Sequence, residues 1–159
     1  MGDFKFEVEI KEMPGFFVAY IRHVGPYNLI GPVFERIGKW VGMRGLWNAD
    51  TKALAAYFDD PGETPPEELR SDACIVVPEG TEGEGEVKTQ VIPGGLFAVA
   101  HVEIDHTQFA DAWGALMGWI QNSGYIPNNG ICYEIYLNDP DSHPEGKFIV
   151  DICEPVKPA

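Results

Sequence analysis

The sequence is poor in basic residues, and this shortage limits what it can bind. Lys and Arg number 11 against 25 Asp and Glu, which leaves a formal net charge of -14. A surface that neutralises nucleic-acid phosphates needs clustered Lys and Arg, so we expect no direct nucleic-acid binding. The excess of acid favours cationic ligands or basic protein surfaces, although solubility alone also explains such a charge.

Neither a membrane span nor a secretion signal is visible in the sequence. No run of 18 apolar residues occurs, and the N-terminal MGDFKFEVEI has no apolar core preceded by positive charge. We therefore expect no membrane association through a helix. Cys74, Cys132 and Cys153 stand singly, without CxxC or Cys/His ligand spacing. Isolated cysteines of odd number predict reduced, buried thiols and a cytoplasmic location.

Motifs for cofactors, metals and the common hydrolases are also missing. The sequence contains no GxSxG, P-loop or GxGxxG, and its four histidines form no HxxxH or HxH pattern. We therefore expect no cofactor and no metal site. His101 and Glu103 share a face of an expected strand, which permits a general-base pair, but a half-exposed polar strand end explains them equally well.

Apolar residues are abundant enough for one well-buried core. They make up 45% of the 159 residues, and 12% are aromatic. This composition is typical of a globular protein, and the length favours a single domain over residues 1–159.

The chain repeats itself with a spacing of about 79 residues. Pairs of identical residues at this spacing are Tyr57 and Tyr136, Asp60 and Asp139, Pro61 and Pro140, Asp72 and Asp151, Cys74 and Cys153, and Trp40 and Trp119. The order of these matches predicts a duplication, with a first repeat at 1–78 and a second at 87–159. Between them, residues 79–86 (EGTEGEGE) are acidic and Gly-rich and predict a flexible tether.

Hydrophobic periodicity predicts the same element order, ββαββ, in each repeat. Expected strands cover residues 4–12, 16–24, 53–59, 72–77, 87–92, 95–103, 131–137 and 147–153, and expected helices cover 30–41 and 107–122. We therefore expect an α+β fold in which antiparallel sheets, related by a pseudo-twofold axis, carry two packed helices.

Glu134 is the most informative candidate for a functional residue. It lies within the expected strand ICYEIYL among apolar and aromatic neighbours, where a charge is costly unless it is paired. Strand alternation puts it on the same side as Tyr136. If that side lines a groove between the repeats, Glu134 is a counter-charge for a cationic ligand. If that side faces solvent, Glu134 is an ordinary surface acid, and the sequence leaves both interpretations open.

Three further aromatic residues are candidates for the walls of such a groove. Tyr57 is the repeat counterpart of Tyr136, Tyr20 lies on a long expected strand, and Trp113 lies on the second expected helix. Aromatic residues at strand or helix spacing more often belong to the core, and the sequence does not decide between the two roles.

Three segments resemble one known family. YFDDPGETPPEELRSDACIVVPE from Tyr57, HVGPY from His23 and CYEIYLNDP from Cys132 are similar to the GyrI-like family, over about residues 5–155. The family includes the DNA gyrase inhibitor and the effector-binding domains of AraC-type and MerR-type multidrug regulators. The resemblance implies a duplicated ββαββ fold, described as paired SH2-like motifs, with a ligand groove in which a strand glutamate takes cationic drugs. That role falls to Glu134.

The resemblance and the residues together leave three functional hypotheses. No helix-turn-helix segment is visible before residue 4, so we expect a stand-alone member that binds hydrophobic or cationic xenobiotics, with Glu134, Tyr136, Tyr20, Tyr57 and Trp113 at the site. The resemblance also implies a hydrolase alternative, in which Glu134 is the general base that opens the cyclopropane ring of DNA-alkylating compounds. A third hypothesis is an interaction with DNA gyrase through an acidic surface.

Overall fold

Residues 4–159 are described by a computed structural model and form two compact units. Unit 1 combines residues 4–14 with residues 94–159, and unit 2 contains residues 15–93. Each unit is an antiparallel sheet with one α-helix, so the predicted α+β class is confirmed. Within residues 4–159, no helix is both long and apolar enough to cross a membrane.

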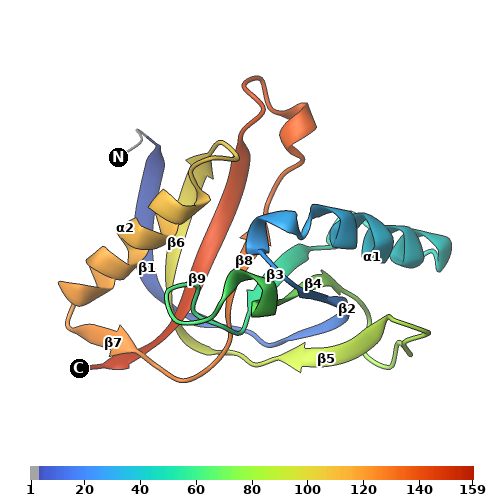
Figure 1. The fold of residues 1–159 in the computed structure, drawn as a ribbon, viewed down its shortest axis with the longest axis horizontal. Helices are drawn as coiled ribbons and strands as arrows, with labels where there is room; N and C mark the ends of the chain where they lie inside the picture. Colours follow the sequence, from blue (N-terminus) through green and yellow to red (C-terminus); the bar gives the residue numbers. More distant parts are fainter. Residues whose placement is uncertain (1–3) are drawn as a thin grey trace. The chain divides into compact units, whose positions relative to one another are not determined.

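Unit 2 is a four-stranded antiparallel sheet covered by one helix (Figure 1). Its elements are β2 (Phe16–Val24), η1 (Tyr27–Leu29), α1 (Gly31–Met43), β3 (Ala53–Tyr57), η2 (Pro66–Glu68), β4 (Arg70–Val76) and β5 (Lys88–Ile92). The strand order is β3-β4-β2-β5. One side of α1 is apolar at helical spacing, and its Val33, Ile37 and Val41 are buried.

Unit 1 is built in a similar way from the rest of the chain. Its elements are β1 (Lys5–Met13), β6 (Gly95–Ile104), α2 (Phe109–Gln121), β7 (Tyr125–Pro127), β8 (Cys132–Tyr136), η3 (Pro140–Ser142) and β9 (Phe148–Pro158). The strand order is β1-β6-β9-β8, and the short β7 pairs with the end of β9. The short β7 was not predicted from the sequence, because three residues are too few to establish an alternating pattern.

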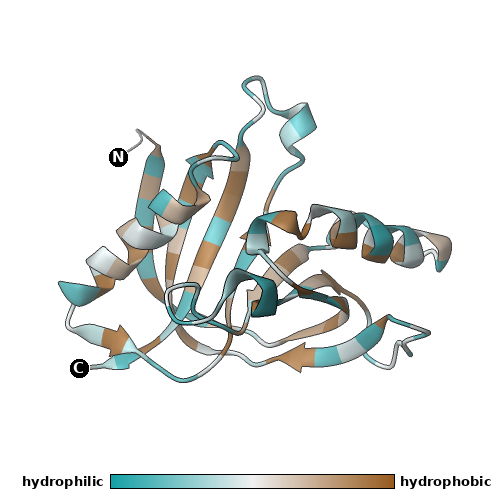
Figure 2. Ribbon diagram, in the orientation of Figure 1, coloured by the Kyte–Doolittle hydropathy of each residue, from teal (hydrophilic) through white to brown (hydrophobic). Residues whose placement is uncertain are grey.

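The core of unit 1 lies between α2 and one face of its sheet. Ala98 and Ala100 of β6 and Ile152 of β9 are fully buried there against Leu116 and Ile120 of α2. Small alanines on the sheet allow the helix to approach closely. Figure 2 shows hydrophobic and hydrophilic residues alternating along β1, the period-two pattern of a strand with one buried face.

The compact units divide the chain differently from the expected repeats. β1 pairs with β6 in unit 1, whereas β5 pairs with β2 in unit 2. Residues 79–86, the expected tether, lie within unit 2, where Glu86 pairs with Arg36 and Glu84 pairs with Arg44. Gly85 has a φ of +61°, which lets the chain turn there. The duplication itself stays a prediction.

Candidate functional site

Glu134 of β8 is a buried carboxylate on the helix-covered face of the unit 1 sheet. Only 3% of the residue is exposed. It lies directly opposite Ile152 of β9, which belongs to the core under α2, and directly opposed residues of antiparallel strands point to the same face. The possibility that Glu134 is an ordinary surface acid is therefore excluded.

Two ring donors hold the Glu134 carboxylate. The indole Nε1 of Trp113 donates to Glu134 Oε2 at 2.6 Å, and the Tyr136 hydroxyl donates to Glu134 Oε1 at 2.7 Å. Trp113 follows the buried Ala112 on α2 and is half-buried itself, as is Tyr136. Both carboxylate oxygens therefore accept a hydrogen bond from an aromatic side chain. Three of the five candidate residues therefore come together.

The other two candidates, Tyr20 and Tyr57, belong to unit 2. Tyr57 ends β3 and is half-buried, and its ring centroid lies 4.7 Å from that of Tyr27. Tyr20 lies on β2 between Cys74 of β4 and Lys88 of β5 and is also half-buried. The participation of Tyr20 and Tyr57 in a ligand site stays a prediction.

Glu154 of β9 is a second acid on the same face as Glu134, and sequence reasoning missed it. It lies opposite Ala98, a core residue under α2. Burial raises the pKa of Glu154 to about 7. The expected strand ended at residue 153, whereas β9 continues to Pro158. The signal that could have found it is the apolar Val156, which extends the alternation of β9 beyond Glu154.

Cys132 lies beside both carboxylates. The β8–β9 register pairs Tyr133 with Cys153, and one step further it brings Cys132 next to Glu154. Burial first, and then the charges of Glu154 and Glu134, raise the pKa of the Cys132 thiol to about 12. Cys132 is therefore a neutral thiol at physiological pH and a poor nucleophile.

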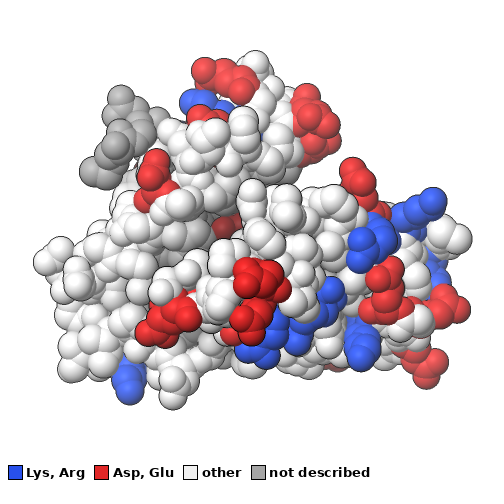
Figure 3. Space-filling model, in the orientation of Figure 1, with Lys and Arg blue, Asp and Glu red and all other residues white. Residues whose placement is uncertain are grey.

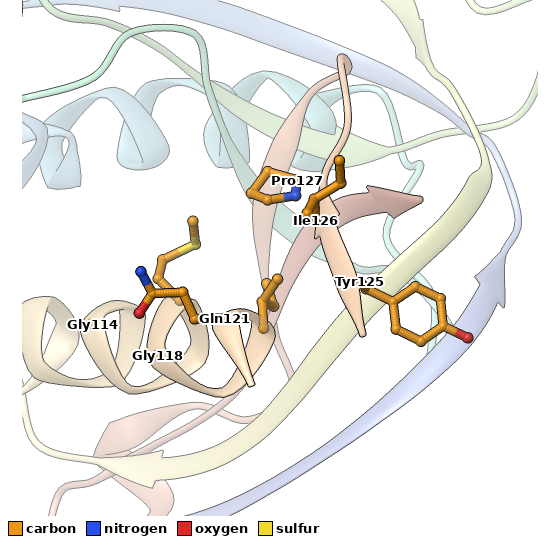
Figure 4. A pocket seen from close by; sticks show the side chains of 8 residues that line it. Gly114, Gly118, Gln121, Tyr125, Ile126 and Pro127 are labelled. Atoms are coloured by element: carbon orange, nitrogen blue, oxygen red, sulfur yellow. The ribbon is translucent and has the colours of Figure 1, made fainter. Parts of the chain in front are cut away.

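An apolar hollow lies between α2 and β7, next to this cluster in the chain. Its volume is about 520 Å³, within the range of small-molecule sites. The lining residues are Gly114, Met117, Gly118, Ile120, Gln121, Tyr125, Ile126 and Pro127. Figure 4 shows Ile126 and Pro127 above the helix residues, with the Tyr125 ring turned away from them. Glu134 is not in its lining, but Gly114 directly follows Trp113 on α2.

The surface of α2 is nearly free of charge on the face seen in Figure 3. Most atoms over α2 are neither acidic nor basic, whereas Lys, Arg, Asp and Glu are mixed over α1. The two glycines and Met117 on the outward side of α2 agree with this picture. An uncharged surface is suited to hydrophobic parts of a ligand.

His101 and Glu103 do not form the general-base pair that their strand spacing permits. The Nδ1 atom of His101 lies 2.8 Å from the Asp151 carboxylate, and the Nε2 atom of His143 lies 2.5 Å from the Glu103 carboxylate. The hydrogen bond with His143 lowers the pKa of Glu103. Within residues 4–159, no three His, Cys, Asp or Glu side chains gather in a way that could hold a metal ion.

Comparison with known proteins identifies the family to which the chain belongs. Residues 6–157 match the family described as GyrI-like small molecule binding domain, and the chain belongs to this family. It is 41% identical over 146 residues to DNA gyrase inhibitor 2 of Dickeya dadantii (strain 3937), covering 89% of each chain.

Solved structures give the same fold. The C-terminal domain of EcmrR superposes with a TM-score of 0.78 at 18% identity, over 97% of this chain and 99% of that domain. The chain spans only 58% of EcmrR in its DNA complex, at 23% identity. A more distant structure, of a protein bound to tetraphenylphosphonium, has a TM-score of 0.57 at 12% identity, over 95% of this chain and 94% of the other.

Proposed function

We propose that this chain binds hydrophobic or cationic organic molecules at the Glu134 cluster of unit 1. The observation that carries this proposal is a carboxylate with 3% exposure whose two oxygens each accept a hydrogen bond from an aromatic residue. Glu134 supplies the counter-charge, and the half-buried rings of Trp113 and Tyr136 supply the walls.

The surroundings of the Glu134 carboxylate favour a cationic ligand. Charge attraction is stronger in a site from which water is largely excluded. Two donor groups on Glu134 are an indole N–H and a phenol O–H, and neither group carries a charge. The faces of Trp and Tyr rings attract cations as well. Glu134, Trp113 and Tyr136 therefore favour a positively charged ligand over a neutral one.

Two further observations support a lipophilic ligand. The hollow between α2 and β7 is apolar and begins on the helix residue after Trp113, so a ligand larger than its charged centre has uncharged surface beside the cluster. A structural relative binds tetraphenylphosphonium, a cation surrounded by aromatic rings. We extend this ligand class, lipophilic organic cations, to the present chain.

Isothermal titration calorimetry with tetraphenylphosphonium tests the proposal. We expect wild-type protein to bind and Glu134→Gln to lose about tenfold or more in affinity, because one charge-assisted contact contributes about 1.5–3 kcal/mol. Neutral triphenylphosphine oxide should show little difference between the two proteins.

A matched control separates the local role of Glu134 from the overall acidity of the chain. Glu9 of β1 is exposed, so Glu9→Gln removes the same charge away from the cluster. We expect its affinity to equal that of the wild type. Equal affinities of wild type and Glu134→Gln for the cation would contradict the proposed counter-charge.

An interaction with DNA gyrase is a second candidate, favoured by the 41% identity to a DNA gyrase inhibitor. The name DNA gyrase inhibitor belongs to the relative. In this chain, the net charge of -14 is suited to binding a basic protein surface. A supercoiling assay with purified gyrase tests it. Unchanged supercoiling at a large excess of this protein would remove this candidate.

Cyclopropane hydrolysis with Glu134 as general base stays a prediction. A base that delivers water must reach the reacting carbon through a bound water molecule. Incubation with a cyclopropane-containing alkylator, followed by mass spectrometry, tests it, and Glu134→Gln is the control. A ring-opened product formed by the wild type alone would favour turnover over simple capture.

A further inference from the structure

Glu154 occupies a position that connects the Glu134 cluster with the apolar hollow. On the helix-covered face of β9, Ile152 lies opposite Glu134 and Val156 lies opposite Pro127, which lines the hollow. Glu154 is the residue of the same face between these two positions, because side chains two apart in a strand point to the same side. Along β9, Glu154 therefore lies between the position of Glu134 and the end of the hollow at Pro127.

The distance along the sheet is short enough for one ligand to reach both acids. Glu154 is the diagonal neighbour of Glu134 across the β8–β9 pair, and such positions lie roughly 7 Å apart. Cys132 lies next to both residues, directly beside Glu154 in the β8–β9 register and two residues before Glu134 on β8. Glu154 is half-buried, so part of it is accessible from outside.

We propose that Glu154 is a second acidic contact of the ligand site and that a bound cation replaces the proton carried by this carboxyl in the empty site. The proposal rests on the proposed function, since it concerns the same ligand. The proton leaves Glu154 for bulk water or buffer, and the resulting carboxylate pairs with the bound cation. Binding is therefore an exchange of one positive charge for another, and it becomes stronger as the pH rises.

Few titratable groups face Glu154. On β6 its neighbour is Ala98, and the residues of α2 that pack on this face, including Leu116 and Trp113, carry no charge. On β8 the titratable neighbours are Cys132 and Glu134. With its thiol pKa of about 12, Cys132 does not titrate in the range of the experiment. Burial alone raises the pKa of Glu154 to about 7, so its proton is exchanged near neutral pH.

The experiment measures the affinity for tetraphenylphosphonium between pH 6 and pH 8. This probe is a permanent cation, so any pH dependence belongs to the protein. With a carboxyl pKa of about 7, full replacement of the proton makes binding about tenfold tighter at pH 8 than at pH 6. Calorimetry at pH 7 in two buffers of different ionisation enthalpy should show about half a proton released per bound cation.

Substitutions of Glu154 test whether this residue causes the pH dependence of cation binding. Glu154→Gln should bind the cation with an affinity that no longer changes between pH 6 and pH 8 and should release no proton. Glu154→Ala, as a second variant, should behave in the same way. Glu12→Gln removes an exposed acid of β1 and should keep the wild-type pH dependence. Neutral triphenylphosphine oxide should bind without pH dependence.

The outcomes separate this inference from the proposed function. A wild-type affinity that does not change with pH, or a Glu154→Gln protein that keeps the wild-type slope, would overturn the proton exchange while leaving cation binding intact. Absence of tetraphenylphosphonium binding at every pH would overturn the proposed function, and the exchange with it. Binding that depends on pH through Glu154 but not on Glu134 would support Glu154 as the acidic contact and contradict the role of Glu134.

Discussion

His101 of β6 lies directly opposite Asp151 of β9, and its Nδ1 atom is 2.8 Å from the Asp151 carboxylate. Unit 2 contains a pair at the same sequence spacing, because Arg22 precedes His101 by 79 residues and Asp72 precedes Asp151 by 79 residues. Arg22 and Asp72 are also direct cross-strand partners, with Nε and Oδ1 2.6 Å apart. Each sheet is therefore tied across two strands by a basic residue and an aspartate.

The two pairs differ in burial, and this predicts different contributions to stability. Asp72 is fully buried and also accepts a hydrogen bond from Gln90, whereas the side chain of Asp151 is 20% exposed. Asp72→Asn removes the negative charge that pairs with Arg22 and should lower the free energy of unfolding by about 1–3 kcal/mol. Asp151→Asn should lower it by less than about 1 kcal/mol. Urea denaturation of both variants at pH 7 measures the difference.

Exposed pairs provide the reference for this comparison. Glu86→Gln removes the partner of Arg36 in a pair whose side chains are both about half exposed, and we expect almost no effect on stability. Equal effects of the three substitutions on the free energy of unfolding would contradict the larger contribution expected from the buried Asp72.

The sequence predicted the elements well because their periodic patterns are long. The expected strands at 4–12 and 16–24 correspond to β1 and β2 within one residue, and both expected helices lie within two residues of α1 and α2. Glu134 and Trp113 could be singled out as candidates because an acid in an apolar strand and an aromatic residue on a helix are local features. Their hydrogen bond, across 21 residues of sequence, was not predicted, because it depends on how α2 lies on the sheet.

Strand partnership was beyond local patterns, and the expected strand was shorter than β9. β1 has the alternation of any half-buried strand, and nothing in that alternation indicates that it pairs with β6. Glu154 was missed because the expected strand ended one residue before it, and its polar side chain was no sign of continuation. The strand continues because Val156 is buried on the same face.

Glycines of the two helices should respond differently to alanine. An added Cβ at Gly118 or Gly114 of α2 meets nothing within 4 Å, whereas at Gly42 of α1 it lies 3.3 Å from the Trp47 ring. Alanine is the better helix former by about 0.5–1 kcal/mol, so Gly118→Ala and Gly114→Ala should each stabilise the protein by about that amount. Gly42→Ala should gain less or nothing, because Trp47 must move. Thermal denaturation ranks the three variants.

Glu154 should also make stability depend on pH. Its pKa is raised to about 7 by burial, from 4.5 in the unfolded chain, so the folded protein holds the proton more tightly. The contribution of this proton to the free energy of unfolding is fully present below pH 4.5 and is lost as the pH rises through about 7. Glu154→Gln has no such proton to lose. Its free energy of unfolding should therefore exceed that of the wild type by up to about 3 kcal/mol at pH 8 and by much less at pH 4.5. Urea denaturation at both pH values tests this. A difference that is equal at both pH values would contradict it.

The hydrogen bonds of Trp113 and Tyr136 should be coupled energetically to Glu134. Trp113→Phe and Tyr136→Phe each remove one donor from a carboxylate with 3% exposure and should lower the free energy of unfolding by about 1–3 kcal/mol. In a Glu134→Gln background the loss should be smaller, which gives a coupling energy of about 1 kcal/mol or more in a double-mutant cycle. Trp119→Phe on the same helix, which packs against the core, is the matched control and should be additive with Glu134→Gln. Additivity of Trp113→Phe as well would mean that the indole contributes only packing.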